Sequence, residues 1–204
     1  MALANYSDLQ SSIAGWLNRT DLTSVIPDFV RVAEARIATS LRIRRQVANT
    51  TLTCTAGVQS VTLPTDFLEA ENLTLSTTSP PAPLSVVTPE IMDRKYPAGY
   101  QTGQPVVYCY LGNTIQLGPT PDAAYVISLD YYQRLDLATS STNWLMTNYP
   151  MVYLAASMVE ACLYTRDDAG VQLWDARYTA EVKRMQDADD EALRSGSAMR
   201  VRAM

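Results

Sequence analysis

The chain has no histidine among its 204 residues, and charged residues make up only 18% of it. Histidine is the commonest general base and the commonest metal ligand, so its absence nearly excludes hydrolases of the usual serine or cysteine triad type. The formal net charge is −5 and the pI is near 4.7. DNA-binding proteins take most of their affinity from a basic surface, so this charge argues against a conventional DNA-binding protein.

Disulfides, metal sites and membrane spans are also not indicated. The three cysteines, Cys54, Cys109 and Cys162, lie far apart, which predicts buried small residues rather than a disulfide framework or a zinc site. No apolar run approaches the roughly 18 residues of a membrane span. The first ten residues, MALANYSDLQ, lack the basic and apolar regions of a secretory signal, which predicts cytosolic synthesis. We find no phosphate-binding or dinucleotide-binding glycine motif and expect no cofactor and no metal.

The segment from Leu22 to Ile37 carries the strongest local signal in the chain. It predicts an amphipathic helix, with Pro27 in the first turn, where a proline is tolerated, and Asp28 directly after it. The apolar positions follow the three-and-four spacing of one helix face: Ile26, Phe29, Val30, Ala33, Ile37 and Leu41. Arginines follow at the far end, where cations suit the helix dipole.

The remaining patterns divide the chain into helical ends and a strand-like middle. A first helix starting near Asn5 or Ser7 carries Leu9, Ile13, Trp16 and Leu17 on one face. A buried helix runs from Pro150 through Tyr164, and a further helix runs from Asp168 to about Arg194. We therefore predict an α+β protein with a helical bundle (1–45 and 143–195), an inserted antiparallel β-rich lobe (46–142) and a flexible C-terminal tail (196–204).

Several strands of the middle region are predicted individually. Residues 47–54 and 58–63, separated by Ala56-Gly57, suggest a hairpin, and 106–111 with 114–117 suggest a second one around Gly112-Asn113. Residues 124–134 show the clearest alternation of period two. Thr88 and Pro89 predict the start of a short helix over 91–96.

Candidate catalytic groups are few. Asp66 with Glu69 or Glu71 offers a carboxylate pair for acid–base chemistry, but the residues sit in an ordinary strand-entry loop, which favours a solvated role. The acidic run 187–191 lacks the glycine and the alternating ligands of a calcium loop. Twelve tyrosines stand against two phenylalanines, and tyrosine is enriched at interfaces. Six of them fall in the strand-like region: Tyr96, Tyr100, Tyr108, Tyr110, Tyr131 and Tyr132.

Six segments in the same order resemble the head-to-tail adaptor (connector) proteins of tailed phages, which form the ring between portal and tail. The first is IPDFVRVAEARI at 26–37, shortly after NRTDL. The others are LPTDFLE at 63–69, PL at 83–84 with VTPE at 87–90, TIQLGPTPD at 114–122 with YY at 131–132, NWL at 143–145 with YPMVYL at 149–154, and DD at 167–168 with WDARY at 174–178. Residues after Arg194 match no motif of the family.

The resemblance implies a structural virion protein rather than an enzyme. Such adaptors are made in the bacterial host cytoplasm and assemble as a homo-oligomeric ring, usually a dodecamer, in the neck of the virion. The ring sits below the portal protein, extends the DNA channel and docks a tail or nozzle protein. DNA passes through the lumen without specific binding, which suits an acidic protein because it repels phosphate. No membrane partner is implied.

We predict partner contacts at basic and aromatic positions: Arg31, Arg36, Arg42, Arg44, Arg45, Arg200, Arg202, Tyr108 and Tyr110. Deleting Gly196–Met204 is expected to weaken portal attachment while leaving the fold intact. Two other hypotheses remain open at this stage. One is a tail-associated carbohydrate-binding or cell-wall-degrading module with the tyrosine-rich lobe as its platform, and the other is an adaptor at the distal end of the tail.

Overall fold

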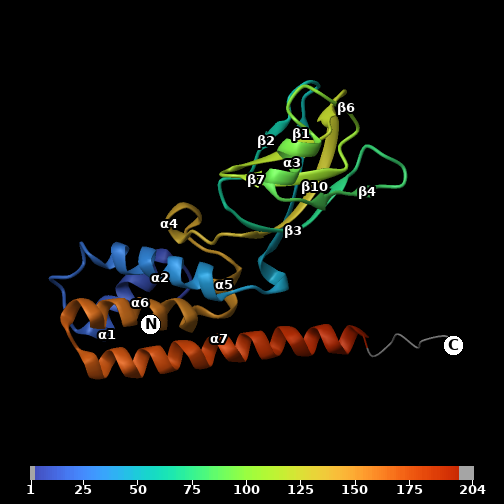
Figure 1. Ribbon diagram of the computed structural model, residues 1–204. Helices are drawn as coiled ribbons and strands as arrows, with labels where there is room; N and C mark the ends of the chain where they lie inside the picture. Colours follow the sequence, from blue (N-terminus) through green and yellow to red (C-terminus); the bar gives the residue numbers. More distant parts are fainter. Residues whose placement is uncertain (1–2, 198–204) are drawn as a thin grey trace. The chain divides into compact units, whose positions relative to one another are not determined.

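The computed structural model describes residues 3–197, with side chains through Ala192 (Figure 1). The chain divides into two compact units: Gln46–Arg134 forms a β unit, and the segments on either side of it form a helical unit. Helical ends around a β region confirm the predicted α+β class.

The helical unit is built around one buried helix, α6. Its helices are α1 (Tyr6–Leu17), α2 (Ile26–Ser40), α4 (Leu137–Ser140), α5 (Trp144–Asn148), α6 (Pro150–Thr165) and α7 (Asp168–Ser197). Helix α6 packs against α7, α2, α1 and α5. The predicted buried helix from Pro150 is thereby confirmed, because a helix with neighbours on every side must be apolar all round.

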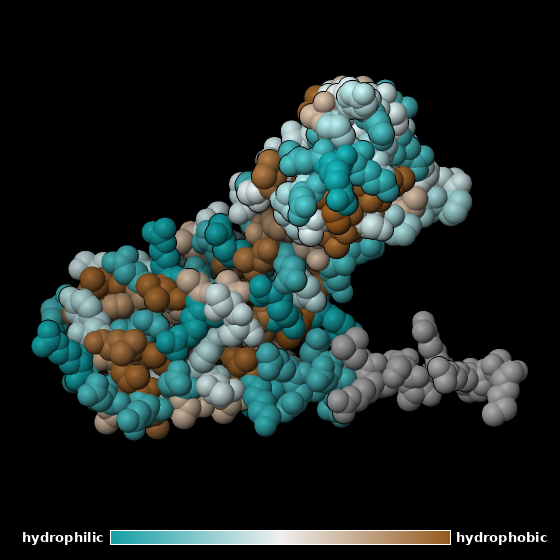
Figure 2. Space-filling view, in the orientation of Figure 1, coloured by the Kyte–Doolittle hydropathy of each residue, from teal (hydrophilic) through white to brown (hydrophobic). Residues whose placement is uncertain are grey.

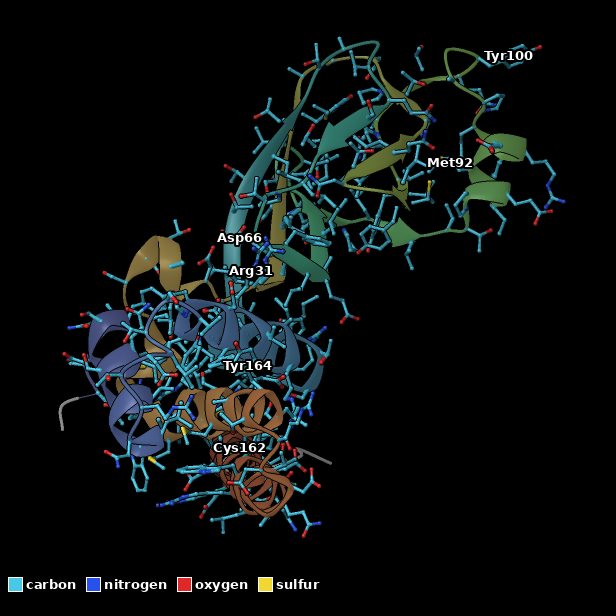
Figure 3. All side chains as sticks on the ribbon, turned by 90° about the vertical axis from the view of Figure 1, so that its left-hand side faces the viewer. Arg31, Asp66, Met92, Tyr100, Cys162 and Tyr164 are labelled. Carbon is cyan, nitrogen blue, oxygen red and sulfur yellow. The ribbon has the colours of Figure 1, made fainter. Side chains whose placement is uncertain are left out.

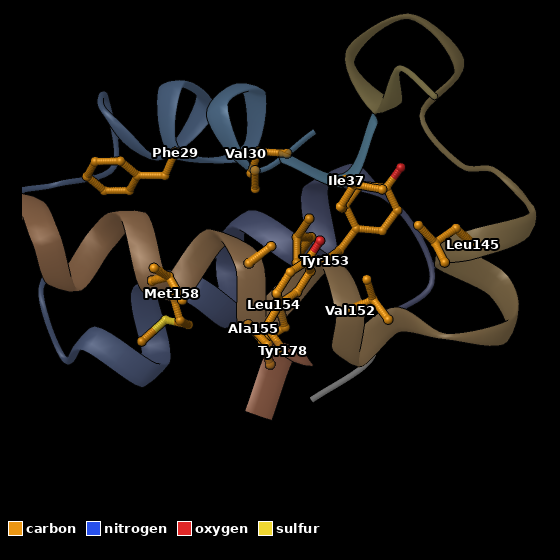
Figure 4. Close-up of a cluster of buried hydrophobic side chains, with 14 of the residues drawn as sticks. Phe29, Val30, Ile37, Leu145, Val152, Tyr153, Leu154, Ala155, Met158 and Tyr178 are labelled. Atoms are coloured by element: carbon orange, nitrogen blue, oxygen red, sulfur yellow. The ribbon is translucent and has the colours of Figure 1, made fainter. Parts of the chain in front are cut away.

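The core of this unit joins the apolar stripe of α2 to α6. Figure 4 shows Val152, Tyr153 and Leu154 of α6 near Val30 and Ile37 of α2. The Tyr153 hydroxyl is buried and accepts a hydrogen bond from the Asn143 side-chain amide at 2.7 Å. The same asparagine caps α5, so one residue satisfies both a helix end and a buried polar group.

Local capping explains where these helices begin. Asn5 accepts a hydrogen bond from the Asp8 backbone N–H at 2.9 Å and caps α1. Pro27 lies in the first turn of α2, as predicted. Asp167 accepts from the Gly170 N–H at 3.0 Å at the start of α7. That helix continues through Ser197, so the first two residues assigned to a tail are helical.

Residues 135–142, which the sequence analysis placed in the β-rich lobe, lie in the helical unit. Leu135 and Leu137 are buried in its core. The Leu137 N–H donates to the Glu34 carboxylate of α2 at 2.7 Å. This segment has no strand pattern of its own, and burial of its two leucines decides which unit it joins.

The β unit contains two four-stranded sheets and one small two-stranded sheet. Sheet A has the order β1 (Val47–Cys54), β10 (Tyr125–Gln133), β3 (Phe67–Leu75), β4 (Ala82–Pro83). Sheet B has the order β2 (Ser60–Thr62), β8 (Thr114–Gly118), β7 (Val107–Leu111), β5 (Ser85–Val86). The small sheet pairs β6 (Thr102–Gly103) with β9 (Thr120–Pro121).

Sheets A and B share one hydrophobic core. The alternation predicted for residues 124–134 is confirmed, because Ile127, Leu129 and Tyr131 of β10 are buried in that core. The hairpin β7–β8 is also confirmed, with Gly112 at a positive φ of 59° in its turn. The central strands are therefore those with the clearest period of two.

The hairpin predicted from residues 47–54 and 58–63 is wrong. β1 pairs with β10 in sheet A over eight residues, whereas β2 pairs with β8 in sheet B. The chain crosses between the sheets after β1, where the Leu117 N–H donates to the Gln59 carbonyl at 2.8 Å. Turn residues between two strands do not distinguish a hairpin from a sheet-to-sheet crossing.

Helix α3 (Pro89–Lys95) begins at Thr88, as predicted, and its Met92 is fully buried. It packs against β7. A Cβ at Gly118 would lie 2.8 Å from both the Met92 sulfur and a ring carbon of Tyr96, so the glycine permits this close packing. Among the described helices, none has the length and apolar character needed to cross a bilayer.

Candidate partner-binding surface

Arg36 of α2 forms ion pairs with two other helices of the same chain. Its guanidinium lies 3.2 Å from Glu160 of α6 and 2.9 Å from Asp175 of α7. It also lies over the Tyr178 ring, 5.9 Å from its centroid. The Tyr178 hydroxyl in turn is 2.7 Å from the Ser40 hydroxyl. Arg36 therefore links α2, α6 and α7. The position of Arg36 on the polar face of α2 does not by itself reveal these contacts.

Arg42 and Arg44 are also engaged within the helical unit. Arg42 donates to the carbonyls of Ala38 and Leu41 at 2.6 and 2.7 Å, which satisfies backbone acceptors at the end of α2. The Arg44 Nε donates to Asp189 of α7 at 3.1 Å, and its backbone N–H donates to the same carboxylate at 3.2 Å. Both arginines fix the chain as it leaves α2.

Arg31 and Arg45 differ from these three. Both are exposed, and neither forms an ion pair within the described part of the chain. Arg31 projects from α2 (Figure 3). Arg45 lines a small groove of about 190 Å³. The other lining residues are Ile43, Arg44, Tyr149, Met185, Ala188, Asp189 and Ala192. Of the predicted arginines with described side chains, these two have charge available for a neighbour.

The two predicted tyrosines have different environments although both lie on β7. Tyr108 is only 8% exposed and belongs to the core between the sheets, whereas Tyr110 is 37% exposed. Their rings meet edge to face at 5.5 Å, and Phe67 lies 6.1 Å from Tyr110. Burial, followed by the neighbouring Tyr108, raises the pKa of the Tyr110 hydroxyl. Tyr108 therefore packs edge to face against the ring of Tyr110 and is itself buried.

Other exposed apolar side chains were not among the partner-contact residues predicted from the sequence. Trp16, predicted on the apolar face of the first helix, is 53% exposed and meets Trp174 edge to face at 5.3 Å. Leu163 and Leu173 are more than half exposed near the turn from α6 to α7, where Figure 2 shows apolar side chains gathered on the helical unit. Tyr100 is 85% exposed and extends from its loop (Figure 3). Periodicity marks these positions as apolar but cannot tell which of them remain uncovered.

Asp66 has a structural position rather than the setting of a catalytic pair. Its carboxylate accepts hydrogen bonds from the Tyr131 hydroxyl at 3.1 Å and the Gln133 amide at 2.6 Å. The Arg134 N–H donates to its carbonyl at 2.6 Å. Burial, and then the Asp66 charge, raises the pKa of Tyr131 to about 12. These bonds hold the entry of β3 against the end of β10.

The remaining predicted positions, Arg200 and Arg202, lie outside the described residues. Within residues 3–197, no group of histidine, cysteine, aspartate or glutamate side chains has a metal-binding arrangement. The described surface offers exposed charge at Arg31 and Arg45 and exposed aromatic area at Tyr110.

The chain matches a known protein family. The model of the SU10 adaptor protein family matches residues 4–202, which includes both units and nearly the whole chain. No curated protein matches. The match agrees with the resemblance seen in the six ordered segments. The chain therefore belongs to the SU10 adaptor protein family, a family of phage head–tail adaptors.

Proposed function

We propose that this protein is the head-to-tail adaptor that forms a ring below the portal, extends the DNA channel and docks the tail. The observation that carries the proposal is the family match over residues 4–202, because it spans the helical and β units together. The family implies contacts with portal and tail proteins and a place in the virion neck.

The charge of the chain suits a protein that lines a DNA channel. The net charge is −5. Strands β1, β3, β4 and β10 of sheet A contain Glu69, Glu71 and Asp130 and no lysine or arginine. A negative wall repels phosphate, so DNA slides past without being held.

A closed ring needs two different complementary faces on every subunit, because neighbouring copies meet head to tail. We propose that the helical unit and the β unit supply them. Arg31 and Arg45 support this assignment for the helical unit, since both are exposed cations without an ion pair in its described part. Tyr110 offers exposed aromatic area on the β unit.

Negative-stain electron microscopy tests the proposal. The purified protein is mixed with its portal protein, and virions are imaged in parallel with antibody against the protein. We expect a ring of this protein below the portal and label at the virion neck. A protein that stays monomeric with portal, or that is absent from virions, would overturn the proposal. Label at the far end of the tail would instead identify a distal adaptor.

A further inference from the structure

Three of the four edges of sheets A and B are short. β2 has three residues, and β4 and β5 have two each. β4 also ends in Pro83, which has no N–H to donate. Natural sheets limit pairing with other chains by such short or proline-containing edges. These three edges therefore offer little for another strand to bind.

The fourth edge, β1, is different. It has eight residues, VANTTLTC, and pairs with β10 in continuous register without a bulge. It contains no proline, glycine, lysine, arginine, aspartate or glutamate. In an antiparallel pair, every second residue directs its N–H and C=O away from the partner strand. No backbone hydrogen bond from Val47–Cys54 to a strand other than β10 occurs within the described residues.

The side chains of β1 also indicate an incomplete sheet. Ala48 and Leu52 are only partly buried, although they pack against the core between the sheets. Asn49, Thr51 and Thr53 face the other side and are exposed. A strand added beside β1 would cover Ala48 and Leu52 with its apolar face and place its polar face beside Asn49 and Thr51.

The sequence at the C-terminal end alternates in a similar way. Residues 198–204 read AMRVRAM, so Met199, Val201 and Ala203 alternate with Arg200 and Arg202. The alternation covers residues 199–203, and the seven-residue segment is one residue shorter than the eight-residue edge. The two arginines suit the outer face of sheet A, where Asp130 lies one strand in from β1 and accepts a hydrogen bond from Asn49 at 2.6 Å. No strand of that sheet carries a cation.

We propose that residues 198–204 of one copy bind the β1 edge of a neighbouring copy as an added strand. The inference rests on the proposed ring, in which each subunit must present two different surfaces. A strand-like segment and an open edge are such a pair, and each copy has one of each. Main-chain hydrogen bonds supply the affinity, and the alternating side chains set the face that points to the core.

Cysteine cross-linking between two singly substituted proteins tests this contact. Leu52→Cys protein is mixed with Val201→Cys protein, assembled with portal and oxidised. In an antiparallel addition with Val201 opposite Leu52, both side chains would lie on the core-facing side of sheet A. Residues opposite each other in such a pair have Cα atoms about 4.5–5.5 Å apart, within disulfide range. We expect a cross-linked dimer. Thr51→Cys with Val201→Cys is the matched control and should link poorly, because Thr51 faces the other side.

A mixture of unmodified protein and Val201→Cys protein shows whether the new cysteine forms a disulfide with the native Cys54, which is buried.

Deleting residues 198–204 should weaken ring assembly by about tenfold or more and expose β1 amides to hydrogen exchange. Rings that form normally with no cross-link would overturn the strand contact but leave the adaptor function in place. A deletion that loses portal binding while keeping the ring would also overturn it. Absence of any ring with unmodified protein would count against the proposed function itself.

Discussion

Replacing Arg36 by alanine tests whether this residue holds the helical unit together or contacts a partner. The guanidinium bridges Glu160 and Asp175, and the Glu160 side chain is only 16% exposed. Partly exposed ion pairs contribute about 0.2–1 kcal/mol each, and a cation above an aromatic ring adds about 0.5 kcal/mol. Leaving the mostly buried Glu160 without its cation adds a desolvation cost. We therefore expect Arg36→Ala to lower the free energy of unfolding by about 1–2 kcal/mol.

The measurement is thermal and urea unfolding followed by circular dichroism at low salt and at about 1 M salt. For a chain of this size, a loss of about 1–2 kcal/mol corresponds to a Tm lower by about 2–8 °C. The difference should shrink at high salt, because screening weakens both ion pairs in the unmodified protein. Arg31→Ala is the matched control on the same helix, and we expect it to change stability by less than about 0.5 kcal/mol.

Equal stability of Arg36→Ala and the unmodified protein would refute this reasoning. So would equal losses for Arg36→Ala and Arg31→Ala, because the second side chain makes no ion pair within the described residues. If Arg36→Ala instead kept its stability but lost portal binding, the arginine would belong to the partner-binding surface.

Three further predictions concern Tyr131, Gly118 and Arg45. Tyr131→Phe should cost about 1 kcal/mol at neutral pH by removing the hydrogen bond to Asp66. The pKa of Tyr131 is raised to about 12 in the folded protein from an ordinary value near 10. The stabilisation by the neutral hydroxyl is therefore complete below about pH 10 and is lost as the pH rises through about 12. Urea unfolding measured against pH should show a flatter alkaline decline in stability for the variant. Gly118→Ala should destabilise the β unit by about 1–3 kcal/mol in denaturant unfolding, since its Cβ meets Met92, and a wild-type midpoint would contradict the packing. Arg45→Glu should leave the Tm unchanged but reduce ring formation with portal in electron micrographs, and normal rings would remove this residue from the interface.

Many of the helices could be predicted because their signals are local. Asn5, Thr88 and Pro150 mark helix starts by capping or by the fixed φ of proline, and these effects act within a few residues. The apolar stripe of α2 and the all-round apolar surface of α6 indicate how deeply each helix is buried. The alternation in β10 likewise indicates a sheet with one face toward a core.

Strand partners and the role of each arginine could not be predicted in the same way. The turn after β1 looks the same whether the chain returns beside it or crosses to another sheet, and only pairing with β10, far away in sequence, decides. Arg36 and Arg31 lie on the same helix and have the same chemistry. One meets carboxylates from α6 and α7, and the other meets none in the described structure.

By itself, the sequence determined the class of this protein: an acidic α+β chain without histidine, with ordered segments that resemble phage adaptors. These properties depend on composition or on patterns over a few helical turns, so they can be read from the sequence without a structure. Only the tertiary structure decided which side chains are available to partners. It buried Tyr108 and engaged Arg36, Arg42 and Arg44 within the chain. It also left the outer edge of β1 unpaired among residues 3–197. The physical reason is that availability depends on contacts between residues distant in sequence, which local patterns do not encode.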